Sequence, residues 1–170
     1  LQLSSKPTIT KQPVSLALGA GDIARFEVTA TGTDPISYQW FKGTSPISGA
    51  TTRVLELRNI ASADAASYFV RVTNSKGSVD SNSATLTLVP LPVIASFTIR
   101  PNPPTVGQAL HLEAVVQGTG PFTYQWLRAG NPISGATGAV LDLTSAEPGT
   151  YSVRVTGPGG TTSRDVTTVV

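Results

Sequence analysis

Residues 38–51, YQWFKGTSPISGAT, are nearly repeated at residues 124–137, which read YQWLRAGNPISGAT. With a shift of 86, residues 21–57 align with residues 107–143 without a gap, and 17 of 37 positions are identical. Self-similarity over such a length indicates two copies of one structural unit. The chain of 170 residues therefore predicts two domains. We place them at residues 1–89, with an N-terminal extension at 1–6, and at residues 90–170.

Short alternating runs in each copy predict β-strands. In ARFEVTA, residues 24–30, apolar and polar side chains alternate, and YFVRV, residues 68–72, has the same period of two. Gly, Pro, Ser and Asn separate the runs, and helical periodicity is missing. Such strands predict an all-β fold with one β-sandwich per copy. They are expected near 7–17, 22–31, 36–43, 53–59, 66–74 and 78–89, and near 93–101, 108–117, 122–128, 139–144, 150–156 and 161–169.

Prolines mark two special places in the chain. Pro90 and Pro92 lie in the segment that joins the copies, residues 88–96. They remove two backbone donors and predict a short, semi-rigid joint. PNPP, residues 101–104, falls in the first strand region of the second copy. We expect it to break that edge strand into two pieces.

The first copy contains a recognisable strand-F pattern. DAASYFV, residues 64–70, resembles the Asp-x-Ala-x-Tyr-x-Cys pattern of immunoglobulin-like domains, with Val70 in the Cys position. Val28 and Trp40 fall where that family places its strand-B Cys and strand-C Trp. The succession GD…YQW…ISGAT…Y resembles the tandem immunoglobulin-like repeats of large bacterial surface and secreted proteins.

The second copy follows the same pattern, with Ala114, Trp126 and the motif EPGTYSV, which ends at Val153. Small apolar residues thus replace both cysteines in both copies, and the chain has no Cys. The resemblance implies two tandem immunoglobulin-like β-sandwiches without the inter-sheet disulfide, each packed around its Trp. It also implies tyrosine corners at Tyr68 and Tyr151, whose hydroxyls bond backbone groups a few residues upstream.

One difference separates the copies before these tyrosines. The second copy lacks three residues there and carries Glu147 in place of Asp64. We therefore expect a tighter turn between its fifth and sixth strands, strands E and F of the immunoglobulin-like order. Asp64 is expected to cap the longer turn of the first copy.

Candidate catalytic and metal-binding groups are scattered. His111 is the single histidine, and alternation with Leu110 and Leu112 places it on an outer face. Nucleophilic catalysis needs a base close to a hydroxyl or thiol, and a calcium loop needs acids at alternating spacing. No acid lies within two residues of another; the ten are Asp22, Glu27, Asp34, Glu56, Asp64, Asp80, Glu113, Asp142, Glu147 and Asp165. We expect a non-enzymatic protein without metal or cofactor.

The charge pattern limits the class of partner. Twelve Lys and Arg are spread singly over the chain, and the net charge is +2. A nucleic-acid interface needs a stripe of positive charge, so no nucleic-acid partner is expected. No apolar run approaches the roughly 20 residues of a membrane span, so no membrane insertion is expected.

One outward patch in the first copy is a candidate contact site. Phe41 follows Trp40 and points outward, as do Phe69 and Arg71 on the neighbouring strand, with Gln39 beside them. The group is either a pair of aromatic side chains that stabilises the sheet or a contact surface for a sugar or a neighbouring subunit. The second copy has Leu127 and Ser152 at the aromatic positions.

The N-terminal LQLSS is the other candidate contact. Leu1 and Leu3 alternate with polar residues, and such a segment suits a strand that is added to the sheet edge of another subunit. It can equally be the tail of a preceding repeat. Head-to-tail contacts of the first kind would generate filaments.

The sequence favours a non-enzymatic structural or adhesion protein outside the cell or on its surface. The leading interpretation is a rigid rod of two bacterial immunoglobulin-like domains, used as a fibre subunit or surface-protein stalk. Its partners would be further copies or neighbouring repeats of a longer chain. The alternative is a carbohydrate-binding or spacer module of a secreted polysaccharide-active enzyme, with a polysaccharide as partner.

Overall fold

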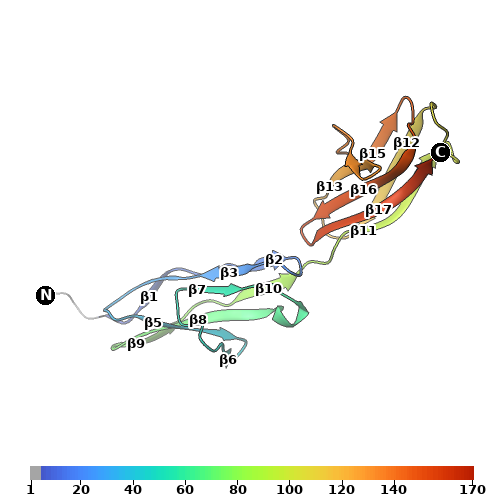
Figure 1. Ribbon diagram of the computed structural model, residues 1–170. Helices are drawn as coiled ribbons and strands as arrows, with labels where there is room; N and C mark the ends of the chain where they lie inside the picture. Colours follow the sequence, from blue (N-terminus) through green and yellow to red (C-terminus); the bar gives the residue numbers. More distant parts are fainter. Residues whose placement is uncertain (1–4) are drawn as a thin grey trace. The chain divides into compact units, whose positions relative to one another are not determined.

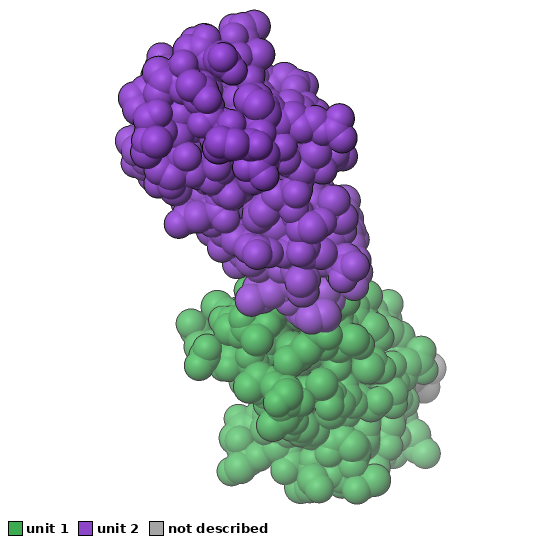
Figure 2. Space-filling view, turned by 90° about the vertical axis from the view of Figure 1, so that its right-hand side faces the viewer, with its two compact units in different colours: residues 1–88 green, residues 89–170 purple. Residues whose placement is uncertain are grey.

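The computed structural model describes residues 5–170. Leu1 and Leu3 lie outside this range. The chain divides into two compact units, residues 1–88 (unit 1) and residues 89–170 (unit 2), which Figure 2 shows in green and purple. The regular secondary structure of residues 5–170 consists of strands, apart from one short 3-10 turn in unit 1 (Figure 1). The predicted all-β fold is confirmed.

Unit 1 is a two-layer sandwich. One layer has the strand order β2-β10-β8-β5-β6, with β9 also paired to β8; the pairs β1–β4 and β3–β7 form the other. A 3-10 turn, η1 (Ser62–Asp64), lies between β7 and β8. The strands are β1 Thr8–Lys11, β2 Leu16–Leu18, β3 Ala24–Glu27, β4 Thr29–Thr31, β5 Ser37–Lys42, β6 Ser45–Pro46, β7 Val54–Leu57, β8 Ala66–Asn74, β9 Gly77–Asp80 and β10 Ala84–Leu88.

Unit 2 repeats this plan with two sheets. Their orders are β11-β12-β15 and β14-β13-β16-β17. Between β15 and β16 there is a plain turn, residues 144–148, without a 3-10 segment. The strands are β11 Val93–Arg100, β12 Leu110–Gln117, β13 Thr123–Arg128, β14 Asn131–Pro132, β15 Val140–Leu143, β16 Gly149–Gly157 and β17 Gly160–Val169.

Each core is built around its tryptophan. Trp40 and Trp126 are both 0% exposed. Their indole N–H groups donate to the carbonyl oxygens of Thr52 and Gly138, both at 2.9 Å. These bonds satisfy the one polar atom of each ring, so the ring can lie between the sheets without a buried unpaired donor.

Apolar side chains fill the place that a disulfide has in many immunoglobulin domains. Val28 and Val70 are fully buried in unit 1, and so is Val153 in unit 2, where Ala114 is nearly buried. Phe26 stacks on Tyr68 with 5.1 Å between ring centroids. Such contacts provide hydrophobic and dispersion energy where a covalent link is absent.

Both tyrosine corners are present. The Tyr68 hydroxyl donates to the carbonyl oxygen of Asp64 at 2.7 Å, and the Tyr151 hydroxyl donates to that of Glu147 at 3.0 Å. The Tyr151 oxygen also accepts the N–H of Glu147 at 3.1 Å. Burial, with a smaller effect of the Asp64 carboxylate, raises the pKa of Tyr68. Each corner ties strand F to the turn before it.

The first strands of the units differ. In unit 1, β1 pairs antiparallel with β4, and β2 pairs parallel with β10, so the strand crosses between layers. In unit 2, β11 is one strand that pairs with β12 through Arg100. The expectation that PNPP breaks this strand was wrong. The prolines at 101, 103 and 104 follow the strand, and because they lack N–H groups they add no second piece.

The start of unit 2 packs on its own β16–β17 hairpin. A Cβ atom at Gly159 would lie only 2.0 Å from the Pro90 carbonyl oxygen, so this position has room for glycine alone. The Thr162 hydroxyl donates to the carbonyl oxygen of Pro92 at 2.8 Å. The prolines of the joining segment are therefore held within unit 2.

Candidate functional site

The aromatic patch of unit 1 is a stacked pair. Phe41 on β5 lies opposite Phe69 on β8 in the sheet register. The two rings are parallel within 2°, with 4.7 Å between their centroids. Parallel rings at this distance cover one another, and they do not lie side by side in one plane.

Arg71 covers the patch from the next position. Its guanidinium carbon lies 5.4 Å from the Phe41 ring centroid. Its Nε and Nη2 atoms donate to the two Asp80 carboxylate oxygens at 2.7 and 2.8 Å. This pairing lowers the pKa of Asp80 and raises that of Arg71, with the hydrogen bond as the main cause in both cases. Arg71 is thereby fixed over the ring.

Gln39 has a structural contact. Its side-chain amide donates to the carbonyl oxygens of Trp40 and Ile47, at 2.9 and 2.8 Å. Gln125 in unit 2 makes the matching pair of bonds to Trp126 and Ile133. Both glutamines hold the turn that follows β5 or β13. The amide nitrogen of Gln39 is therefore engaged in hydrogen bonds to the backbone.

The geometry bears on what this patch can bind. Stacking of a sugar requires an open ring face, and the Phe41 ring has Phe69 and Arg71 against it. The described arrangement matches a sheet-stabilising pair supported by a cation–π contact. In unit 2, Leu127 and Ser152 pair at the matching positions, and Leu127 is 5% exposed.

His111 lies on the outer face of β12, opposite Asp142 on β15 and Arg100 on β11. Its Nδ1 atom is 2.6 Å from the Asp142 Oδ1 atom. Within residues 5–170, no hydroxyl is hydrogen-bonded to His111, and no cluster of three or more His, Cys, Asp or Glu could hold a metal. The pair has the form of a surface bridge between strands.

The predicted contact at Leu1 and Leu3 precedes the described residues. The first described residue, Ser5, is bonded to its own unit. Its carbonyl oxygen accepts the Asn74 side-chain amide at 2.8 Å, and its N–H donates to the Thr33 hydroxyl at 2.8 Å.

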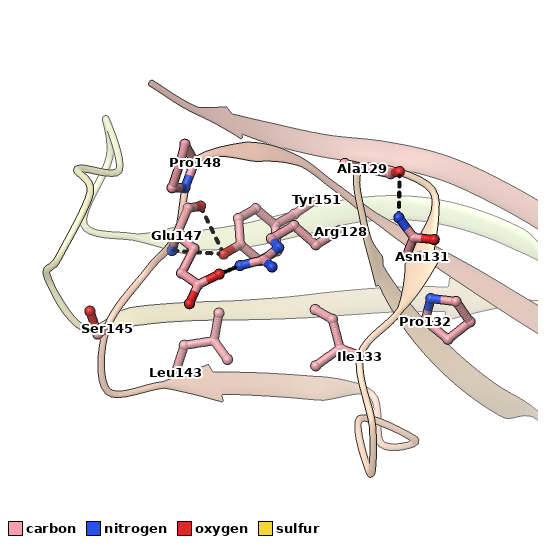
Figure 3. A pocket seen from close by; sticks show the side chains of 10 residues that line it. All are labelled: Arg128, Ala129, Asn131, Pro132, Ile133, Leu143, Ser145, Glu147, Pro148 and Tyr151. Atoms are coloured by element: carbon pink, nitrogen blue, oxygen red, sulfur yellow. Dashed lines mark hydrogen bonds and ion pairs between the residues drawn. The ribbon is translucent and has the colours of Figure 1, made fainter.

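A pocket of about 460 Å³ lies at one end of unit 2 (Figure 3). Ile133 and Leu143 point into it from one side, and Arg128 extends along the other toward Glu147, with which it forms an ion pair. The Tyr151 hydroxyl lies beside this pair. The remaining lining residues are Ala129, Asn131, Pro132, Ser145 and Pro148.

The turn beside this pocket is shorter than the corresponding turn of unit 1. In unit 1 the corresponding turn carries η1, and the Lys42 Nζ atom donates to its Ala63 carbonyl oxygen at 2.6 Å. Unit 2 has Arg128 at the place of Lys42 but lacks η1. The missing three residues are visible in the sequence, yet they did not by themselves reveal a pocket.

Comparison with known proteins agrees with the fold. Residues 7–88 match the immunoglobulin I-set domain family. Over 98% of its length the chain aligns with the titin I-band fragment I67-I69 at a TM-score of 0.62 and 20% identity, and covers 66% of that fragment. Both units therefore have the immunoglobulin-like fold.

Two relatives are much longer than this chain. Hemicentin-2 of Mus musculus is 31% identical over 98% of the chain, which spans 4% of that protein. Endoglucanase C of Cellulomonas fimi is 33% identical over 48% of the chain and 8% of its own length. In both cases the likeness is to a short segment of a longer protein. Within residues 5–170, no helix has the length and apolar character needed to cross a membrane.

Proposed function

We propose that this chain is a non-enzymatic structural segment of a bacterial extracellular protein, in which the two units serve as repeats of a stalk or as a fibre subunit. The observation that carries the proposal is the repetition of a complete core. Each unit buries its own tryptophan, and no buried side-chain nitrogen or oxygen among residues 5–170 lacks a hydrogen-bond partner. Units with complete cores of their own are suited to serve as repeats of a structural protein.

Its location and assembly can be tested together. An antibody against the full chain should label intact cells of the source organism, and external protease should remove the label. Light scattering and negative-stain microscopy of the purified chain then separate a fibre subunit, which assembles with concentration, from a stalk segment, which stays monomeric. A label that appears only after the cells are opened would contradict the proposal.

The partners of this segment would be neighbouring repeats or further copies. Strand addition through Leu1 and Leu3 remains a prediction. Removal of residues 1–4 keeps Ser5 and its bonds to Thr33 and Asn74, so unit 1 should stay intact. If strand addition drives assembly, the truncated chain should stay monomeric at concentrations where the full chain associates.

A second candidate function is a carbohydrate-binding or spacer module of a secreted polysaccharide-active enzyme. The similarity to endoglucanase C favours it. Migration of the chain in gels with embedded polysaccharide tests it, with Phe41→Ala and Phe69→Ala as variants of the aromatic patch. Retardation that both variants abolish would support a sugar contact there. Unchanged migration in every polysaccharide would exclude a binding module.

A further inference from the structure

The pocket of unit 2 has the dimensions of a small-ligand site. Its volume of about 460 Å³ lies within the usual range of roughly 300–1,000 Å³. Ile133 and Leu143 form an apolar side, and the prolines at 132 and 148 lie at its margin (Figure 3). An apolar wall with a few polar groups opposite is the usual composition of such sites.

The polar side of the pocket retains unused hydrogen-bonding capacity. The side chains of Arg128 and Glu147 are 38% and 63% exposed, and among the described residues each is the other's side-chain partner. A guanidinium has five N–H donors, and a carboxylate has about four acceptor positions. Spare donors and spare acceptors therefore lie next to one another on the same wall.

The charges of this wall select the class of ligand. An anion would gain from Arg128 but would be repelled by Glu147, and a cation would meet the reverse. A neutral polyol avoids both penalties, since one hydroxyl accepts from the guanidinium while its neighbour donates to the carboxylate. The C–H face of a sugar ring would then rest on Ile133 and Leu143.

We propose that this pocket of unit 2 binds a neutral saccharide unit. The site goes beyond the structural role proposed above and is separate from the aromatic patch of unit 1. Its failure would leave the location and assembly of the chain unaffected, so the two proposals can be judged independently.

Unit 1 provides an internal control for this site. At the matching place, the Lys42 ammonium donates to the Ala63 carbonyl oxygen at 2.6 Å and lies 3.7 Å from the Asp64 carboxylate. The Asp64 carboxylate also accepts the Ala61 N–H at 2.9 Å, so both side chains are already bonded to the turn of their own unit. Binding should therefore be confined to unit 2.

The test is a titration of the full, 15N-labelled chain with neutral hexasaccharides of glucose, xylose and mannose, followed by NMR. We expect at least one to shift the amides of residues 128–133 and 143–151. Glu147→Gln should weaken binding at least about tenfold, and Ser145→Trp, which fills the pocket from an exposed turn, should abolish it. Lys42→Ala should leave it unchanged. Retained dispersion of the unit 2 signals checks that each variant is folded.

Three results would overturn the proposal. One is the absence of shifts with every neutral sugar at millimolar concentration. Another is binding that Ser145→Trp leaves intact. The third is tighter binding of an acidic hexasaccharide, such as one of galacturonate, at the same residues. If Glu147→Gln disturbs unit 2, Ser145→Trp decides the outcome.

Discussion

The first strand segment of unit 1 passes from one layer to the other, as β1 and then β2, whereas the first strand of unit 2, β11, stays in one sheet. In unit 1 the segment between β1 and β2 also bonds to β10 and to the residues just before it, because the Gln12 and Ser15 side-chain oxygens accept the N–H groups of Asn82 and Thr85, both at 2.9 Å. In unit 2, Thr162 and Arg164 instead direct their side chains to carbonyl oxygens of the incoming chain. Two units with the same type of core can thus differ in how their first strand is attached to the sheets.

The ends of the units differ in the same way. Ile60, 1% exposed, fills the core below the longer turn of unit 1, and Ala146 takes the equivalent place in unit 2. The equivalence follows from the backbone, since the N–H groups of both residues donate to the carbonyl just after a turn glycine, at Asp22 and Gln108. The pocket of unit 2 lies at this shorter turn, where Ser145, Glu147 and Pro148 line it.

The largest expected effect tests whether the two units unfold independently. Trp40→Ala should destabilise unit 1, and Trp126→Ala unit 2, each by about 3–5 kcal/mol, because each removes the centre of one core. Denaturant unfolding followed by the remaining tryptophan reports on the unmutated unit. Its midpoint should stay unchanged. A shared shift would show that the two units unfold as one.

A smaller effect is expected at the joining segment. Gly159→Ala would push Cβ against the Pro90 carbonyl, so the backbone must move, and unit 2 should lose about 1–3 kcal/mol. Lys76 has the equivalent hairpin position in unit 1, and Lys76→Ala is the matched control. Calorimetry of both variants checks this, and equal melting temperatures would contradict it.

The tyrosine corners should also respond unequally. Tyr68→Phe removes one hydrogen bond, to the Asp64 carbonyl oxygen. Tyr151→Phe removes two, the bond to the Glu147 carbonyl oxygen and the bond from the Glu147 N–H. We expect a loss of about 0.5–1.5 kcal/mol in unit 1 and a larger one in unit 2. Urea unfolding measures both, and a larger loss in unit 1 would reverse the interpretation.

The smallest effect is a pH dependence confined to unit 1. The folded pKa of Asp80 is lowered by Arg71, so its stabilising effect is present above the unfolded pKa and is lost as pH falls through the folded value. Asp80→Asn should cost at most about 1 kcal/mol at neutral pH, because the pair is exposed. Its effect should vanish in acid. Unit 2 has Ser163 opposite Arg154 at the matching position and should not respond.

Much of the fold could be predicted because periodic patterns determine it. The alternation around Trp40 identified the buried face and, by the same rule, the outward Phe41 and Phe69. The tyrosine corners followed from the family resemblance. These features depend on residues close in sequence or on one repeated pattern.

The site was harder to predict because it depends on space left unfilled. Arg128 and Ile133 gave no pattern different from Lys42 and Ile47 in the other copy. The pocket lies beside a turn that lacks the 3-10 segment of unit 1, and the Arg128 side chain extends along it toward Glu147. The strand crossing of unit 1 likewise depends on competition between two sheet edges, which hydrophobic alternation does not report.

The parallel pairing of β2 with β10 has a mechanical consequence. Along the chain, β2 is the first strand of this sheet in unit 1 and β10 is the last, and the two lie side by side. Three residue pairs join them. If a chain is pulled at both ends, tension draws the two strands in opposite directions along their axes and loads all three pairs together in shear. Among the described residues of unit 2, β11 pairs with β12 and β17 pairs with β16. We therefore expect the two units to yield at different forces, so that a stretched chain lengthens in two steps.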